Sequence, residues 1–320
     1  MIQPFKILML IISFSFFRIS SAMQTMITDT FNILAPLFTL ILGGFLFSKA
    51  FNLSNETLVR VVTDFFMPIL VFNSLYSANI TSRGIGKIAG ATIFVILVLL
   101  VISYIYSSIF KIDKRSFIPP IIFMNSGFLG IPLMKLWGGL APMNMIVIYD
   151  QIQTFFIFTL GILIVTGGFS VKGLKEMLLS PLLWAIVLGF ATRYSGIRMP
   201  QTVTRIMTFA GNPAPALAAF ALGGSLSEKR LSIDKHTFSS ITIRFILGFL
   251  SGYLATVIFG INGTLKTVII VASALPSAVF SFVLPMRYDI NHDHPGSVVL
   301  FTTLISILTI PLSFIVASLL

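Results

Sequence analysis

Two apolar segments of the chain are each interrupted near their middle by glycine and proline. The first interruption, at 125–133, reads N-S-G-F-L-G-I-P-L, and the second, at 274–278, reads A-L-P-S-A. Inside a bilayer an interrupted backbone is satisfied only by protein, by water in a cavity or by a ligand. The N-termini of half-helices carry partial positive charge and free N–H groups, so two that meet attract a carboxylate. The pair therefore predicts a site for a small anion, as secondary transporters build at the membrane midplane.

The candidate substrate-binding residues are small or polar and lie mostly at the two interruptions. Glycine lets the backbone unwind or approach another helix closely, and proline frees an upstream carbonyl because it removes a donor. An asparagine side chain offers both a donor and an acceptor. A kinked packing helix would explain either interruption alone, whereas the matched pair favours a site. The predicted set is Asn125, Ser126, Gly127, Gly130, Pro132, Pro276, Ser277 and, beside the proline of an earlier span, Asn73.

Asp150 and Gln153 are candidates for coupling transport to an ion. A carboxylate at the bilayer centre costs about 2.5–3.5 kcal/mol on insertion scales, so a membrane aspartate is functional by default. Asp150 has no charged neighbour in its segment and is followed by Gln151 and Gln153, which makes a polar cluster in an apolar span. H+ and Na+ are both candidate ions, and uniport is the alternative. No other cofactor and no bound metal are expected.

The remaining charges inside apolar segments have simpler explanations. Asp64 follows Arg60 by one helical turn, so we expect these two side chains to pair. Arg205 and Arg244 also enter apolar segments, and we expect their heads to reach the membrane interface while their stems stay in lipid.

The composition defines the elements that must position these residues. Of the 320 residues, 56% are hydrophobic and only 10% charged, and the mean hydropathy is +1.01. Stretches of roughly 20 apolar residues, each long enough to cross a bilayer, recur along the chain. We therefore predict an all-α, multi-pass integral membrane protein with ten spans. Their approximate limits are 28–50, 56–77, 86–110, 117–138, 142–167, 181–195, 200–226, 238–260, 264–285 and 297–319.

The ten spans divide into two five-helix repeats, 28–167 and 181–320, joined by a linker at 168–180. M-P-I-L-V-F-N-S-L at 67–75 matches A-P-A-L-A-A-F-A-L at 214–222, and the interrupted fourth span matches the interrupted ninth. An odd number of spans per half forces the halves into opposite orientations, so a 5+5 inverted repeat is predicted, with the site where the halves meet. Residues 1–27 form an N-terminal extension that is a signal-like segment, a short extra span or the product of a mis-assigned start.

The other compositional features exclude several classes of function. The net charge of +11 is scattered over short loops without a basic patch, so nucleic acid is not an expected partner. The Lys and Arg residues favour a cell-membrane protein whose core N-terminus and C-terminus both lie outside the cytoplasm. The chain has no cysteine, which excludes disulfides and thiolate metal sites. No catalytic motif is present, so no enzyme is predicted.

Several motifs, in order, resemble the auxin efflux carrier family of permeases from about residue 28 onward. The motifs are N-I-L-A-P-L-F at 32–38 with Gly43-Gly44, Pro68, the pattern at 125–133, P-x-L-x-x-x-A-L-G-x-x-L at 215–226, and L-T-I-P-L at 308–312. The resemblance implies a fold similar to that of sodium/proton antiporters and bile acid symporters, in which spans four and nine cross beside the substrate. It also implies a scaffold of spans one, two, six and seven that can dimerise, and a moving unit of the others.

The resemblance implies small organic anions as substrates, such as dicarboxylates or aromatic carboxylates. The sequence departs from the family in two respects: the ninth span, A-L-P-S-A-V-F-S-F, is less polar after its proline, and no long loop like that of the plant exporters is present. These departures indicate a bacterial-type permease and make auxin itself doubtful. We predict a carrier that moves a small organic anion, a carboxylate, by alternating access. The alternative is a ligand-sensing membrane receptor built on a transporter fold.

Overall fold

The computed structural model describes residues 28, 31–32, 35–36, 38–51, 53–77, 84–168, 171–228 and 234–320. Within these residues the chain is almost entirely helical and contains no strand. Five helical segments are long and apolar enough to cross a membrane: Asn55–Ser77, Ile85–Ile109, Leu140–Val165, Lys235–Ile258 and Asp293–Leu319. They coincide with the second, third, fifth, eighth and tenth predicted spans, so the prediction of an all-α protein with membrane-length helices is confirmed. The extension at 1–27 lies outside the described residues.

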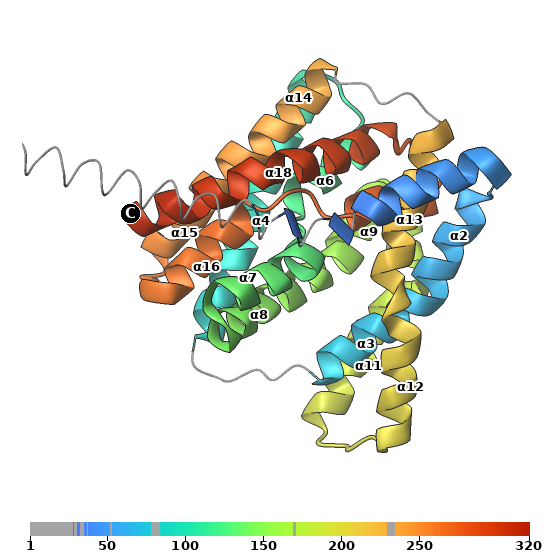
Figure 1. The fold of residues 1–320 in the computed structure, drawn as a ribbon, viewed down its shortest axis with the longest axis horizontal. Helices are drawn as coiled ribbons and strands as arrows, with labels where there is room; N and C mark the ends of the chain where they lie inside the picture. Colours follow the sequence, from blue (N-terminus) through green and yellow to red (C-terminus); the bar gives the residue numbers. More distant parts are fainter. Residues whose placement is uncertain are drawn as a thin grey trace, which may run out of the picture.

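Figure 1 shows how the helices are arranged along the chain. An apolar helix, Phe38–Phe51, lies in the first predicted span. The rest of the first half contains α2 (Asn55–Val61), η1 (Val62–Phe66), α3 (Met67–Ser77), α4 (Ile85–Ile109), α5 (Lys114–Phe117), α6 (Pro119–Ile122), η2 (Ser126–Gly130), α7 (Ile131–Gly138), α8 (Leu140–Phe156), η3 (Ile157–Gly161) and α9 (Ile162–Val165). The second half contains α11 (Pro181–Tyr194), α12 (Gln201–Gly211), α13 (Pro213–Glu228), α14 (Lys235–Thr242), η4 (Ile243–Leu247), α15 (Gly248–Ile258), α16 (Gly263–Ser273), α17 (Phe280–Arg287) and α18 (Asp293–Leu319). The predicted linker contains a further helix, α10 (Val171–Leu179).

Polar side-chain caps set where several helices begin. The side chains of Ser54, Asp113, Ser180 and Asp234 each accept a main-chain N–H from the first turn of the helix that follows. Such caps satisfy one of the four N–H groups that a helix leaves unpaired at its start. Three of the long segments also contain a π-helical turn, η1, η3 and η4, which widens the helix locally.

The fourth and ninth predicted spans are each divided into helical pieces. Helix α6 ends at Ile122, Phe123 is extended (φ −109°, ψ 124°), and η2 begins at Ser126. Helix α16 ends at Ser273, and α17 begins at Phe280. Met124 and Ser277 form an isolated antiparallel bridge between the two extended stretches. These stretches therefore satisfy each other's backbone in place of the missing helical hydrogen bonds.

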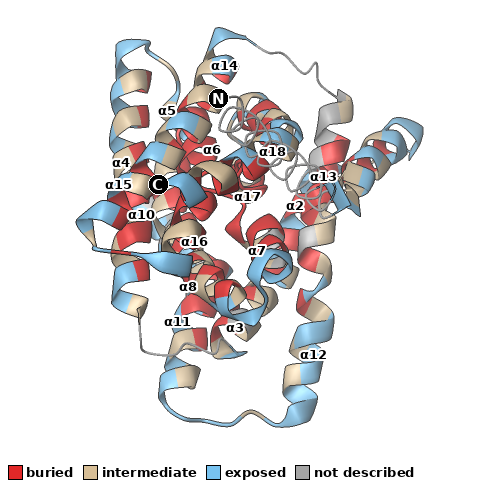
Figure 2. Cartoon of the chain, turned by 60° about the vertical axis from the view of Figure 1, so that its left-hand side comes forward, coloured by how far each residue is buried: buried red, intermediate tan, exposed pale blue. Residues whose placement is uncertain are grey.

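Two main-chain hydrogen bonds hold the stretches together. The N–H of Asn125 donates to the carbonyl of Pro276 at 2.8 Å, and the N–H of Ala278 donates to the carbonyl of Phe123 at 2.9 Å. Pro276 has no N–H of its own, but its carbonyl is thereby paired. We refer to Phe123–Asn125 and Ala274–Val279 together as the crossing. In Figure 2 buried residues gather around α6, α7, α8, α16 and α17, whereas the free end of α12 is largely exposed.

Glycines bring helix Phe38–Phe51 and α13 into contact backbone to backbone. A Cβ added to Gly44 would collide with the carbonyl of Phe220, and one added to Gly223 would collide with the carbonyl of Ile41. Only glycine permits so close an approach. The two helices therefore pack with no side chain between them at these points.

The expected pairing of Asp64 with Arg60 is wrong. Arg60 pairs with Glu56 at 2.9 Å, while Asp64 pairs with Arg287 at the end of α17 at 2.8 Å. Glu56 lies four residues before Arg60, which is the favourable order for a helical ion pair. Asp64 lies in the π-helical turn η1, which alters the spacing along the helix. The ion pair of Asp64 thus joins the second predicted span to the ninth.

Candidate functional site

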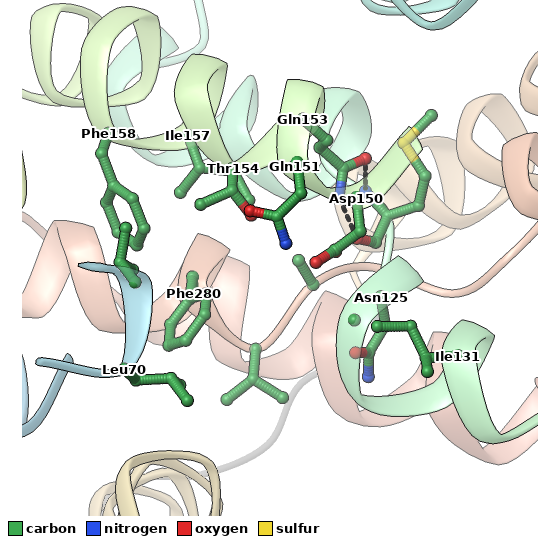
Figure 3. A pocket seen from close by; sticks show the side chains of 15 residues that line it. Leu70, Asn125, Ile131, Asp150, Gln151, Gln153, Thr154, Ile157, Phe158 and Phe280 are labelled. Carbon is green, nitrogen blue, oxygen red and sulfur yellow. Dashed lines mark hydrogen bonds between the residues drawn. The ribbon is translucent and has the colours of Figure 1, made fainter. Parts of the chain in front are cut away.

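A cavity of about 260 Å³ lies beside the crossing, between α3 on one side and α8, η3, η2 and α17 on the others. One end is polar and the opposite wall is apolar. Figure 3 shows Asp150 and Gln151 pointing into it from α8, while Leu70 and Phe280 lie across from them. The lining residues are Leu70, Val71, Met124, Asn125, Gly127, Ile131, Asp150, Gln151, Gln153, Thr154, Ile157, Phe158, Ala278, Val279 and Phe280.

Hydrogen bonds at the polar end join α8 to the first interruption. The hydroxyl of Ser126 donates to Oδ1 of Asp150 at 2.7 Å and accepts from Nε2 of Gln153 at 2.8 Å. Gln153 also accepts from the main-chain N–H of Met124 at 3.1 Å and donates to its carbonyl at 2.5 Å. Gln153 therefore supplies the hydrogen bonds that a continuous helix would have given to Met124.

The carboxylate of Asp150 occupies the position beside the start of η2. A Cβ built on Gly127 would lie 3.0 Å from Oδ1 and 3.2 Å from Oδ2 of Asp150. A helix N-terminus stabilises a negative charge. We expected this helix end to face the substrate anion, whereas in the structure it faces a carboxylate of the protein itself.

Two amides of the cavity contain a buried polar atom without a hydrogen-bond partner among the described residues. They are Nδ2 of Asn125 and Oε1 of Gln151. Asn125 is 2% exposed and Gln151 is 7% exposed. A buried polar atom left unpaired costs about 1–3 kcal/mol, so a molecule that pairs with both atoms would gain from doing so.

The structure brings together some of the predicted site residues and separates others. Asn125, Gly127, Asp150 and Gln153 line the cavity, and Ser126 lies directly behind Asp150. Of the remaining members of the predicted set, Gly130, Pro276, Ser277 and Asn73 are not among the described lining residues, and the side chain of Pro132 lies outside the described part of the structure.

The structure gives each of these residues a position in the fold. Gly130 packs against Ile146 and Leu275, and Pro132 lies in the first turn of α7. Ser277 is fully buried in the crossing, where its N–H donates to the hydroxyl of Thr302 and its own hydroxyl donates to the carbonyl of Pro120. Pro276 accepts from Asn125. Asn73 donates to the hydroxyl of Thr208 at 3.0 Å, which ties α3 to α12.

The expectation that Arg244 reaches the membrane interface is wrong. Arg244 lies in η4 and is 0% exposed. Its Nη1 donates to the carbonyl of Ile121 at 2.6 Å, and its Nη2 donates to the carbonyl of Ser273. These carbonyls lie in the last turns of α6 and α16, where a helix leaves its acceptors unpaired and carries partial negative charge. The guanidinium therefore donates hydrogen bonds to the C-terminal ends of both half-helices.

The path of this side chain depends on small neighbours. Gly248 and Gly252 lie one and two turns after Arg244, and a Cβ on either would meet Ser273, with the one on Gly248 also meeting the guanidinium. Tyr149 on α8 approaches the same place, because its hydroxyl lies 3.4 Å from the hydroxyl of Ser273. The signal that could have identified Arg244 is the spacing R-x-x-x-G-x-x-x-G, which places two glycines on the arginine's face of the helix.

The prediction from sequence did not include any residue of the apolar wall of the cavity. Leu70 and Val71 come from α3, Ile157 and Phe158 from η3, and Phe280 from α17. Hydrophobic residues are so frequent in every span that none of these stood out. Only the arrangement of the helices selects them.

Comparison with known proteins shows similarity to membrane transporters. Residues 168–314 match the family model described as "Membrane transport protein". An uncharacterized transporter of Methanothermobacter thermautotrophicus is 25% identical over 288 residues, covering 85% of this chain and 93% of that protein. An uncharacterized transporter of Methanocaldococcus jannaschii is 25% identical over 291 residues, covering 85% of this chain and 94% of its own length.

A plant protein adds the link to the family that the motifs indicated. "Probable auxin efflux carrier component 9" of Oryza sativa subsp. japonica is 27% identical over 140 residues, which cover 42% of this chain and 33% of that protein. The resemblance seen in the motifs is thus confirmed by an independent comparison. The chain is similar to membrane transporters and to auxin efflux carrier components, and its apolar helices are those of a multi-pass membrane protein.

Proposed function

We propose that the protein is a secondary carrier that moves a small organic anion, a carboxylate, by alternating access around the crossing. The cavity beside the crossing would hold the anion while one group of helices moves against the other. Asn125 would donate to the carboxylate, and Gly127 would let it approach the backbone. Asp150 and Gln153 would couple its movement to H+ or Na+.

One observation carries this proposal: two interrupted segments bond to each other through main-chain groups beside a cavity that both of them line. Asn125 and Gly127 reach the cavity from the first segment, and Ala278 and Phe280 reach it from the second. An interrupted backbone at membrane depth is tolerated where it is packed in protein or lines a cavity. Helix α3 bounds the remaining side of the cavity. If the interrupted segments and α8 move against a stationary α3, the cavity can open to either face of the membrane.

The proposed arrangement in the membrane follows from the predicted repeats. We propose a ten-span, 5+5 inverted repeat in the cell membrane, with the core N-terminus and the C-terminus outside the cytoplasm. The first, second, sixth and seventh spans would form a stationary scaffold that can pair with a second copy in a homodimer. The third to fifth and eighth to tenth spans would move.

Counterflow in liposomes tests the proposed function. Purified protein is reconstituted in vesicles loaded with unlabelled malonate, malate, benzoate or hexanoate, and uptake of the labelled form is followed. A carrier gives saturable uptake that an internal substrate accelerates. A channel gives uptake without counterflow, and a sensor binds without flux, so either result would contradict the proposal.

Replacement of Asn125 by Ala tests the binding site without disturbing the fold. The crossing uses the main-chain N–H of Asn125, so it survives loss of the side chain. We expect lower flux with unchanged insertion and unfolding temperature. Asn262→Ala is the matched control, because Asn262 is exposed before α16 and its side chain caps nothing. Unchanged flux in Asn125→Ala would remove Asn125 from the site.

A further inference from the structure

The main-chain groups of the crossing have lost their helical partners, and each buried one needs another. Main-chain bonds between the two stretches pair the N–H groups of Asn125 and Ala278. In the first stretch, the side chain of Gln153 pairs with both the N–H and the carbonyl of Met124. The second stretch also contains a group that neither stretch can pair, the main-chain N–H of Ser277.

The N–H of Ser277 has no acceptor within its own segment. In a continuous helix it would donate to the carbonyl of Ser273, four residues earlier. That carbonyl accepts instead from the guanidinium of Arg244. Ser277 is fully buried in the crossing, so its N–H is shielded from water. A buried donor left unpaired is costly, and the acceptor must therefore come from another helix.

Thr302 on α18 supplies this acceptor. The N–H of Ser277 donates to Oγ1 of Thr302 at 3.1 Å. The hydroxyl proton of Thr302 is directed elsewhere, because it donates to the carbonyl of Val298 at 2.7 Å, one turn earlier in α18. That second bond fixes the side-chain rotamer of a threonine in a helix. The oxygen is thereby held in one place, where it accepts from Ser277.

The main chain that Thr302 holds leads directly into the cavity. Ala278, Val279 and Phe280 follow Ser277, and all three line the cavity. Figure 3 shows Phe280 across the cavity from the polar residues of α8. The ring centroid of Phe280 lies 5.7 Å from that of Phe158 in η3. The position of Ser277 therefore determines where this part of the apolar wall lies.

An equivalent contact holds the first interruption. Gln153 on α8 follows its partner Ser126 by 27 residues, and Thr302 on α18 follows its partner Ser277 by 25 residues. These helices lie in the fifth and the tenth predicted spans. In each predicted half, the last span thus sends one polar side chain back to the interrupted span that precedes it.

The neighbouring residue on α18 shows what an ordinary helix hydroxyl does. Thr303 is as buried as Thr302, and its hydroxyl likewise donates to the carbonyl one turn earlier, that of Val299, at 2.6 Å. Among the described residues the hydroxyl of Thr303 makes no other hydrogen bond. The two threonines therefore differ in one respect, which is that only Thr302 accepts the N–H of Ser277.

We propose that Thr302 is a positioning residue of the carrier, whose hydroxyl holds the main chain of Ser277 and thereby places Phe280 at the cavity. This inference rests on the proposed carrier function. Thr302 is not among the described lining residues, so it acts on the substrate through Ser277. Loss of its hydroxyl should weaken substrate binding more than it slows the movement of the helices.

Hydrogen–deuterium exchange of the purified protein in detergent tests the contact without any ligand. The exchange rate of the Ser277 amide is compared in the wild type and in Thr302→Val, Thr302→Ser and Thr303→Val. We expect exchange at least about tenfold faster in Thr302→Val, because the amide has lost its acceptor. Thr302→Ser keeps the hydroxyl and Thr303→Val keeps Thr302, so both should match the wild type. If Thr302→Val does not fold, Thr302→Ala removes the hydroxyl without placing a methyl group against Ser277.

Counterflow in liposomes tests the consequence for transport, with labelled benzoate, hexanoate, malonate and malate as probes. Thr302→Val should raise the KM about three- to tenfold and leave the maximal rate within about twofold of the wild type. Thr302→Ser should restore the KM, and Thr303→Val should not change it. A general loss of stability would instead reduce the amount of active protein, and with it the maximal rate.

Several outcomes would overturn the inference while leaving a carrier intact. They are unchanged exchange at Ser277 in Thr302→Val, faster exchange with an unchanged KM, and a Thr302→Ser variant as impaired as Thr302→Val. Absence of wild-type counterflow for all four carboxylates would overturn the proposed function. The exchange rates would then still decide whether Thr302 holds Ser277.

Discussion

The guanidinium of Arg244 donates a hydrogen bond to the main-chain carbonyl of Ser273, the last residue of α16. The same group reaches the carbonyl of Ile121 in α6, so an arginine from the eighth predicted span bridges the two half-helices that precede the crossing. Among the described residues no carboxylate forms an ion pair with it. Its charge is balanced instead by the partial negative charge of the helix ends.

Replacing Arg244 by Met should lower both stability and transport. Two buried carbonyls would lose their donor, at about 1–3 kcal/mol each. We expect a lower unfolding temperature in detergent and reduced counterflow. Arg244→Lys keeps the charge but not the fork that reaches two carbonyls, so an intermediate loss is expected.

Arg205→Met is the control for this prediction. Arg205 enters an apolar segment in the same way but is exposed on α12. Equal losses in the Arg244 and Arg205 variants would show that neither depends on the contacts with Ile121 and Ser273.

Replacing Gly127 by Ala should reduce transport with little effect on folding. The new Cβ would lie within 3.3 Å of three atoms of the Asp150 carboxyl group, so the carboxylate must shift by a few tenths of an ångström. A misplacement of about 1 Å at a site can cost about a hundredfold in rate, and for this smaller shift we expect a loss of up to about tenfold. Gly86→Ala on α4 is the control, because its Cβ would meet nothing within 4 Å. A Gly127 variant as active as the Gly86 variant would contradict a role for this carboxylate position.

The Asp64–Arg287 pair should affect the rate of transport more than stability. Its side chains are 37% and 27% exposed, so a coupling energy of about 0.2–1 kcal/mol is expected from a double-mutant cycle of Asp64→Asn and Arg287→Gln. If α17 moves relative to the second span, this pair must break in each cycle. The single variants and the double variant should then change the exchange rate by a similar factor of up to about fivefold.

The Glu56–Arg60 pair provides the comparison for that cycle, since it lies within one helix and is 60% and 51% exposed. Glu56→Gln and Arg60→Gln should leave the exchange rate unchanged. If the variants of both pairs changed the exchange rate equally, the effect at Asp64 and Arg287 would not be due to motion between helices.

Hydropathy and helix-breaking residues predict the helices well, because both depend on local sequence. The second, third, fifth, eighth and tenth spans lie within a few residues of the observed helices, and the helical pieces at 119–138 and 263–287 follow the glycine and proline positions. The class of protein and the resemblance to auxin efflux carriers were therefore accessible from sequence alone.

Contacts between distant residues were not accessible in this way. Arg244 binds main-chain carbonyls 123 and 29 residues away, and a carbonyl carries no side-chain signature. Asp64 was assigned to its neighbour Arg60 because sequence proximity was the only available criterion, whereas its partner Arg287 lies 223 residues away. The apolar wall around Phe280 and Leu70 depends on the same long-range packing.

The glycine contact between helix Phe38–Phe51 and α13 has a mechanical consequence. Gly44 and Gly223 lie against the carbonyls of Phe220 and Ile41, so sliding of one helix along the other would bring main-chain atoms into collision. We therefore expect these two helices to move together. If the helices move as proposed, the displacement should occur where they meet through side chains, as α3 and α17 do through Leu70 and Phe280 at the cavity.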